Sequence, residues 1–215
     1  MGDTNSSTGP PPSANPDSQR ELLNTIDKRV TSEEQALLNA TISRDELTDA
    51  LKHMKANSAP GMDGLPAGFY RVAGKDFGKC LSTVFNFQLS RGELLPFQRK
   101  SAVCMLHKKG LRDDPGNFRP ISLIGIDVKA LSKVLTYRLQ TFLPQLIHGD
   151  QKTFVQGRPI HHHVRFMADL QDLVTARKEE AYAMFIDIEK VYDRVNWDYM
   201  FQVLDRMVCG GALTD

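Results

Sequence analysis

The spacing of hydrophobic residues predicts a series of amphipathic helices. In residues 47–54, apolar side chains recur at the spacing of one helix face. Just before this stretch, Ser43 and Glu46 form a capping-box pair, and Ile42 and Leu47 are placed as a hydrophobic staple. The same periodicity predicts further helices over residues 77–85 (ending before Gly92), 128–142, 163–177 and 197–208 (ending at Gly210-Gly211).

Short apolar runs between these helices predict strands. Residues 102–107 and 121–126 are separated by a basic turn that contains Lys108, Lys109 and Gly110. Residues 182–188 form a nearly continuous apolar run, the pattern of a buried central strand. Because helices and strands are mixed without an internal repeat, the fold class is α/β or α+β.

The composition is that of an ordinary globular protein. The chain has 215 residues, 27 Lys and Arg against 26 Asp and Glu, and 41% hydrophobic residues. These values exclude a wholly disordered, collagen-like or disulfide-scaffold protein. No apolar run approaches the roughly 18 residues of a membrane helix, and there is no secretory signal. Three scattered cysteines without a CxxC pair favour a reduced intracellular chain, cytoplasmic or nuclear, without structural zinc.

The N-terminal residues differ from the rest. Residues 1–19 are rich in Pro and polar residues and contain no Lys or Arg. Such a segment cannot bury enough apolar surface to offset its conformational entropy. Residues 1–40 are therefore expected to be a disordered or weakly ordered tail, with order beginning near Ile42.

Asp187 is the most informative position for chemistry. A carboxylate in a buried apolar strand is costly unless it is paired or bound to a metal. Glu189 would lie on the same face if the strand continues, and Asp193 follows the turn. Alternatively, Asp187 caps a turn or pairs with Lys190. From spacing alone, the metal site and these structural roles have about equal weight.

Residues 99–119 form a second candidate region, with six Lys and Arg against two acids. Phosphoryl transfer on a polyanion needs cations that hold the phosphates, next to a strand whose carboxylate holds a metal ion. The alternative is a solvated hairpin tip. The triplet His161-His162-His163 is interpreted as an exposed helix start, because three adjacent side chains do not converge on one metal ion.

Blocks of sequence in a fixed order resemble a known family. They are SAPGMDG (58–64), NFRPISL (117–123), DQKTFVQGRPI (150–160) and FIDIEKVYDRVNW (185–197). Together they resemble the reverse transcriptase (RNA-directed DNA polymerase) of LINE-type non-LTR retrotransposons, over residues 40–208. The resemblance implies a right-hand polymerase, with residues 41–180 as fingers and 181–215 as the start of the palm. It also implies an RNA template, a DNA primer, dNTP substrates and two-metal nucleotidyl transfer.

The resemblance also implies roles for individual residues. Asp187 is the catalytic ligand of Mg²⁺ (or Mn²⁺), helped by the Ile188 backbone carbonyl. Tyr192 packs under the sugar of the incoming dNTP, and Arg119 and Lys108 hold its triphosphate. Nucleic acid is expected along the residues Lys109, Gln151, Phe154, Gly157 and Arg158.

Several positions depart from the family pattern. Val191 replaces a small Ala, Tyr192 a more usual Phe, and Thr153 a Gly. The second aspartate block does not occur after Asp187, and the only Asp-Asp pair is Asp113-Asp114. The chain is therefore expected to be truncated before that block, to bind metal only with the missing downstream aspartates, to be inactive alone, and to self-associate through an uncovered palm face.

Three other functions remain open from the sequence. A non-catalytic RNA-binding module would use the same basic turn, with salt-sensitive affinity. A metal-dependent nuclease would rest on Asp187 and Glu189. A degenerate transposon relic would have no selected function.

Overall fold

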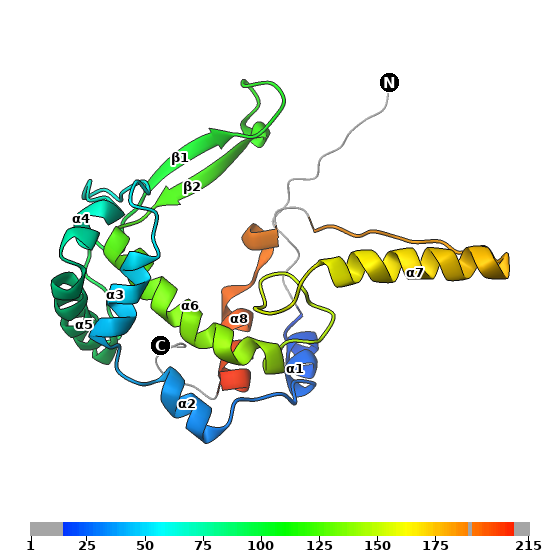
Figure 1. Ribbon diagram of the computed structural model, residues 1–215, viewed down its shortest axis with the longest axis horizontal. Helices are drawn as coiled ribbons and strands as arrows, with labels where there is room; N and C mark the ends of the chain where they lie inside the picture. The colour runs from blue at the N-terminus through cyan, green and yellow to red at the C-terminus, as the bar shows by residue number, and fades with distance from the viewer. Residues whose placement is uncertain (1–14, 189–190, 209–215) are drawn as a thin grey trace. The chain divides into compact units, whose positions relative to one another are not determined.

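The computed structural model describes residues 15–188 and 191–208, apart from the Asp193 side chain (Figure 1). These residues divide into two compact units. The first, Ser32–Thr141, is called the hairpin unit below. The second contains the described residues up to Thr31 and from Phe142 onward, and is called the loop unit. Helices dominate and only a small antiparallel sheet is present among the described residues, so the fold is a mixed α+β type.

The hairpin unit is built around a helical core. Its elements are α2 (Ser32–Leu38), α3 (Arg44–Lys52), α4 (Ala67–Val72), α5 (Gly74–Ser90), β1 (Ala102–His107), η1 (Pro115–Asn117), β2 (Phe118–Leu123) and most of α6 (Ile126–Leu146). Helix α3 packs along α5, and Leu47, Leu51, Phe85, Ile126 and Val134 are fully buried. The predicted helices over residues 77–85 and 128–142 are confirmed, and the one over residues 47–54 is confirmed as far as Lys52, where α3 ends.

The start of α3 confirms the predicted capping box. The Ser43 hydroxyl accepts from the Glu46 backbone N–H at 3.2 Å, and Glu46 Oε2 accepts from the Ser43 backbone N–H at 2.8 Å. Each bond satisfies an N–H that has no partner within the helix. Ile42 and Leu47, the predicted staple, both lie in the core of this unit.

Strands β1 and β2 form one antiparallel hairpin, with Ala102 opposite Leu123 and His107 opposite Phe118. Figure 1 shows it projecting from the helices of its own unit. The prediction for β1 is confirmed, but the prediction of a strand over residues 121–126 is wrong at both ends. The strand begins at Phe118 and passes through Pro120, which a hairpin tolerates because each strand has an outer edge.

The loop unit contains α1 (Pro16–Asn24), the last turn of α6, α7 (His161–Arg177), η2 (Val191–Arg194) and α8 (Trp197–Val208). The predicted helices over residues 163–177 and 197–208 are confirmed. The predicted end of the last helix, at Gly210-Gly211, lies outside the described residues. No helix in the part of the chain that the structure describes is long and apolar enough to cross a membrane.

The expectation that order begins near Ile42 is wrong. Helix α1 starts at Pro16, where the Asn15 side chain accepts from the backbone N–H of Asp17 at 3.0 Å. Arg206 of α8 donates to the Leu23 carbonyl and the Asn24 side chain, at 3.3 and 2.6 Å. Polar contacts between distant segments therefore order a stretch whose apolar content is low.

The prediction of a buried central strand over residues 182–188 is also wrong. These residues form an irregular, exposed segment, and the Phe185 side chain is 84% exposed. A strand needs a neighbour for its backbone N–H and C=O groups. Among the described residues, β1 and β2 pair only with each other, so the apolar run has no ladder to join. Self-association through this segment stays a prediction.

Candidate nucleic-acid interface

The hairpin tip is defined here as residues 107–119, and it carries the predicted cations of the hairpin unit. Lys108 N donates to the Asn117 carbonyl at 2.8 Å, which extends the ladder one pair beyond His107 and Phe118. Arg119 lies opposite Leu106. Because side chains alternate along a strand, this register places Lys108 and Arg119 on the same face of the hairpin. Both residues and Lys109 are exposed.

Uncharged and acidic groups shape the turn itself. The Asn117 side-chain amide donates to the Leu111 carbonyl at 2.9 Å and to Asp114 Oδ2 at 3.3 Å. Asp114 Oδ1 accepts from the Gly116 N–H at 2.8 Å, and Gly110 has a φ of 85°. Bonds from Asn117, Asp114 and His107 therefore hold the turn, while Lys108, Lys109 and Arg119 are exposed. A group of exposed positive charges suits an anionic ligand.

The SAPGMDG block packs against the start of α6. Lys129 Nζ donates to the Ala59 carbonyl at 2.9 Å. At Gly61 the two backbones approach so closely that a Cβ would lie 2.6 Å from Gly125 N and 2.7 Å from Gly125 Cα. Only glycine leaves room for this contact, so the block has a packing role in the hairpin unit.

We expect Gly61→Ala to lower the free energy of unfolding by roughly 1–3 kcal/mol, because the new methyl group meets backbone atoms that cannot rotate away. Urea unfolding followed by far-ultraviolet circular dichroism measures the loss. Gly74→Ala is the matched control, because a Cβ there meets nothing within 4 Å. Equal stabilities of the two variants would contradict the close approach at Gly61.

In the loop unit, four predicted residues share one loop between α6 and α7. The Gln151 side chain donates to the Thr153 carbonyl at 3.2 Å, Phe154 has a φ of 62°, and Gly157 has a φ of 77°. The Phe154 side chain is 81% exposed, whereas Val155 beside it is buried. Arg158 donates to backbone carbonyls of the same region. The loop therefore presents an aromatic ring from a backbone anchored by its neighbours.

The predicted catalytic segment is exposed. Asp187, Ile188 and Tyr192 lie at the surface, with Tyr192 in η2. The prediction that Asp187 is a buried carboxylate is wrong, because the residue is exposed and its charge carries no burial cost. Glu189 and Lys190 lie outside the described residues. Among the described residues, no group of three or more His, Cys, Asp or Glu side chains is placed to hold a metal ion.

The histidine triplet begins α7, which confirms the predicted helix start. The rings of His161 and His162 meet edge to face at 4.9 Å, and His163 Nε2 lies 2.6 Å from the Asp150 carbonyl. His163 thus ties the start of α7 to the loop that carries Gln151 and Phe154.

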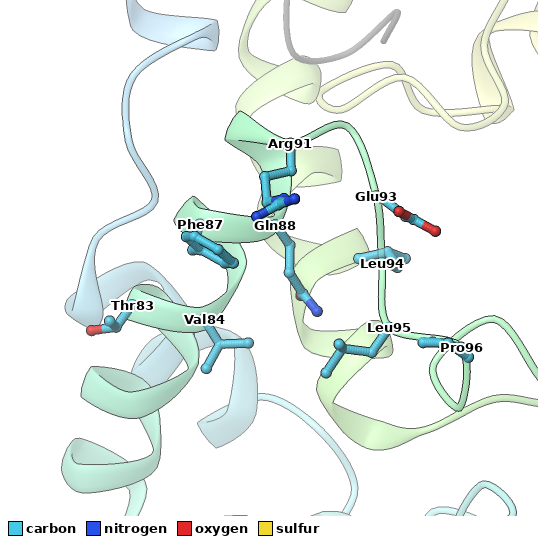
Figure 2. Close-up of a pocket in the computed structure, with 9 residues that line it drawn as sticks. All are labelled: Thr83, Val84, Phe87, Gln88, Arg91, Glu93, Leu94, Leu95 and Pro96. Carbon is cyan, nitrogen blue, oxygen red and sulfur yellow. The ribbon is translucent and has the colours of Figure 1, made fainter.

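An apolar cavity of about 600 Å³ in the hairpin unit was not predicted (Figure 2). It lies between α5 and residues 93–96, and the predicted site residues do not line it. Figure 2 shows Gln88 reaching from α5 toward Leu95, and the Arg91 guanidinium lies 5.4 Å from the Phe87 ring centre. The available signal was Phe87, an apolar residue that is 60% exposed on α5 and lies two positions beyond the buried Phe85.

The sequence matches known proteins of one family. Residues 106–213 match the family model described as "Reverse transcriptase (RNA-dependent DNA polymerase)". The chain is 32% identical over 198 residues to the "Transposon TX1 uncharacterized 149 kDa protein" of Xenopus laevis, covering 90% of this chain and 15% of that protein.

Two further relatives come from insects. The chain is 24% identical to the "RNA-directed DNA polymerase from mobile element jockey" of Drosophila melanogaster (73% of this chain, 17% of the relative). It is 20% identical to the "Retrovirus-related Pol polyprotein from type-1 retrotransposable element R2" of Nasonia vitripennis (74% and 15%). The chain thus spans about a sixth of the length of these relatives. The resemblance to non-LTR retrotransposon polymerases is confirmed, and the chain belongs to the reverse transcriptase (RNA-dependent DNA polymerase) family.

Proposed function

We propose that the chain is part of a retrotransposon polymerase that copies an RNA template into DNA from a DNA primer. In this proposal residues 41–180 belong to the fingers and residues 181–215 begin the palm. The observation that carries the proposal is the order of the blocks 117–123, 150–160 and 185–197 within the matched residues 106–213. The exposed cations of the hairpin tip give the chain a chemical means of holding phosphates.

Roles in dNTP binding are proposed separately for the hairpin unit and for the loop unit, the first for the triphosphate and the second for the sugar. Lys108 and Arg119 share that face, and a guanidinium with a neighbouring ammonium suits a triphosphate. The Tyr192 ring is exposed on η2 and is proposed to pack under the sugar of the dNTP.

Asp187 is proposed as the catalytic metal ligand. Its exposed carboxylate and the adjacent Ile188 carbonyl are hard oxygen donors, which fit Mg²⁺ or Mn²⁺. When bound, such an ion lowers the pKa of an attacking hydroxyl, here the primer 3′-OH. Because Mg²⁺ takes six ligands, we propose that water, substrate phosphates and carboxylates outside the described residues supply the others.

Template and primer are assigned to the hairpin tip and to the loop of residues 150–160. Lys109 at the tip supplies positive charge, and Gln151, Phe154, Gly157 and Arg158 lie in the loop. Exposed aromatic rings stack on bases, and cations attract the phosphate backbone, so each region carries a component of single-strand binding.

The test is RNA binding by the full chain over a range of salt concentrations. We expect the triple substitution of Lys108, Lys109 and Arg119 by Gln to weaken binding. It should also make the negative slope of log K against log salt shallower by about 2, roughly 0.7 for each lost phosphate contact. Lys75→Gln with Lys79→Gln, on exposed positions of α5, is the control. A slope unchanged in the triple variant would overturn the assignment of the hairpin tip.

A second assay separates catalysis from binding alone. Primer extension on an RNA template with dNTPs and Mg²⁺ or Mn²⁺ is expected to give no product with this chain, which would then act as a binding part of a larger polymerase. Incorporation that is lost in Asp187→Asn would show instead that the chain is catalytic by itself. Metal-dependent cleavage of the RNA would favour the nuclease alternative.

A further inference from the structure

The Arg158 guanidinium lies at the C-terminal end of α6. Nη2 donates to the carbonyls of Pro144 and Ile147 at 2.5 and 3.1 Å. Nη1 donates to the carbonyls of His148 and Gln151 at 2.6 and 3.0 Å. The last carbonyls of a helix have no partner within the helix, and the negative end of the helix dipole attracts a cation. Arg158 is therefore a side-chain cap for a helix of 21 residues.

This set of bonds uses all four hydrogens on the two terminal nitrogens of the guanidinium. A bidentate bond to a phosphate needs at least one of these hydrogens, because Nε carries only a single N–H. Arg158 therefore cannot form a bidentate bond to a phosphate without losing hydrogen bonds to the end of α6 or to the first turn of the loop. Lysine, with three donors on one nitrogen, cannot reproduce the arrangement.

The hydrogen bonds from Arg158 support a loop with an unusual backbone. Phe154 has a φ of 62°, a region that bulky residues rarely adopt, and Gly157 has a φ of 77°. The Arg158 backbone N–H donates to the Val155 carbonyl at 3.3 Å, and the Val155 side chain is buried. Strain of this kind persists only where surrounding bonds hold it. Arg158 supplies bonds on both sides, to the end of α6 and to Gln151.

We propose that Arg158 is a positioning residue for nucleic-acid binding, which holds the loop so that the Phe154 ring is presented to a base of the bound RNA. It acts through the loop and makes no phosphate contact of its own. This inference rests on the proposed function. It assigns Arg158 a different physical role from that of Lys109, although both are cations near the nucleic acid.

The test combines binding and hydrogen exchange on the full chain with a single-stranded RNA oligonucleotide. The variants are Arg158→Gln, Arg158→Lys, Phe154→Leu and the double variant Arg158→Gln with Phe154→Leu. We expect either Arg158 variant to weaken binding about tenfold, the loss typical of one stacked base, with an unchanged salt slope. Amide exchange in residues 148–157 should rise in both.

The double variant is the decisive readout. If Arg158 acts by presenting Phe154, adding Arg158→Gln to Phe154→Leu weakens binding little further, because the two residues act as one unit. Additive losses would overturn the inference. The inference would also be overturned if Arg158→Gln made the salt dependence shallower while Arg158→Lys bound RNA about as well as the unaltered chain. That result would identify a phosphate contact. Lys109→Gln is the control that should lower the slope.

Failure of this inference can be told apart from failure of the proposed function. If the unaltered chain does not bind RNA, the proposed function fails and this inference fails with it. If the unaltered chain binds RNA but the Arg158 and Phe154 losses are additive, only the positioning role fails.

Discussion

Phe85→Ala will lower the free energy of unfolding of the hairpin unit by about 3–5 kcal/mol. Phe85 is fully buried on the face of α5 that packs against α3, in the same core as Leu47 and Leu51. Alanine removes most of this buried surface and leaves a cavity that the surrounding helices only partly fill. This core supports the hairpin that carries Lys108 and Arg119.

Urea unfolding followed by far-ultraviolet circular dichroism, with amide exchange in α3 and α5, measures the effect. Fluorescence is a poor choice, because the only tryptophan, Trp197, lies in the loop unit. Phe87→Ala is the matched control on the same helix, since its side chain is 60% exposed. We expect that variant to lose less than about 1 kcal/mol. Similar losses at the two positions would show that Phe85 is not in the core.

Local patterns predicted helices α3, α5, α6, α7 and α8, but not the short helices α2 and α4. Residues 47–54 carry their own information, because the apolar spacing defines the buried face and Ser43 with Glu46 defines the start. The same holds for β1 and for the turn after it, where Lys108-Lys109-Gly110 interrupts an apolar run. Features that depend on neighbours in sequence could therefore be found without the structure.

Features that depend on partners far away in the sequence could not be found without the structure. Residues 182–188 have the pattern of a buried strand, but a strand forms only where another offers its backbone, and the pattern does not contain that partner. Helix α1 looked too polar to be ordered, yet Arg206 binds its end from 182 residues away. For the candidate site, the blocks identified which residues to consider, but not that Arg158 binds backbone carbonyls.

Arg138 is a second arginine whose role only the structure reveals. From α6 it donates to both carboxylate oxygens of Glu46, at 2.7 and 2.9 Å. It also donates to the carbonyls of Leu38, Ala40 and Thr41, at 3.1, 2.5 and 3.0 Å. The side chains of Arg138 and Glu46 are 12% and 34% exposed. One guanidinium thereby joins α6 to the end of α2 and the start of α3.

Arg138→Met will lower the free energy of unfolding by roughly 2–4 kcal/mol, because it leaves the Glu46 carboxylate and three carbonyls without their donor. The partial exposure of Glu46 keeps the loss below that of a fully buried pair. Arg99→Gln removes an exposed ion pair to Glu93 in the same unit and is expected to cost at most about 1 kcal/mol. Equal losses in the two variants would contradict this role for Arg138.

The same cluster makes the stability of the hairpin unit depend on pH. The hydrogen bond from Arg138, with further bonds from Ser43, outweighs partial burial and lowers the pKa of Glu46 from 4.5 to about 2. Above pH 4.5 the carboxylate is ionised in both states, so its contribution to stability is fully present. As the pH falls from 4.5 toward 2, the unfolded chain binds a proton that the folded chain does not, and the contribution is lost.

Glu46→Gln isolates this effect, because glutamine keeps the shape and some of the hydrogen bonds but does not titrate. The unaltered chain should be more stable than the variant at neutral pH, and the difference should shrink steadily as the pH is lowered to about 3. Urea unfolding of both proteins at each pH measures it. A difference that stays constant over this range would mean that the Glu46 charge contributes nothing to the link between α3 and α6. The hydrogen bonds from Arg138 to the three carbonyls would then hold these helices together by themselves.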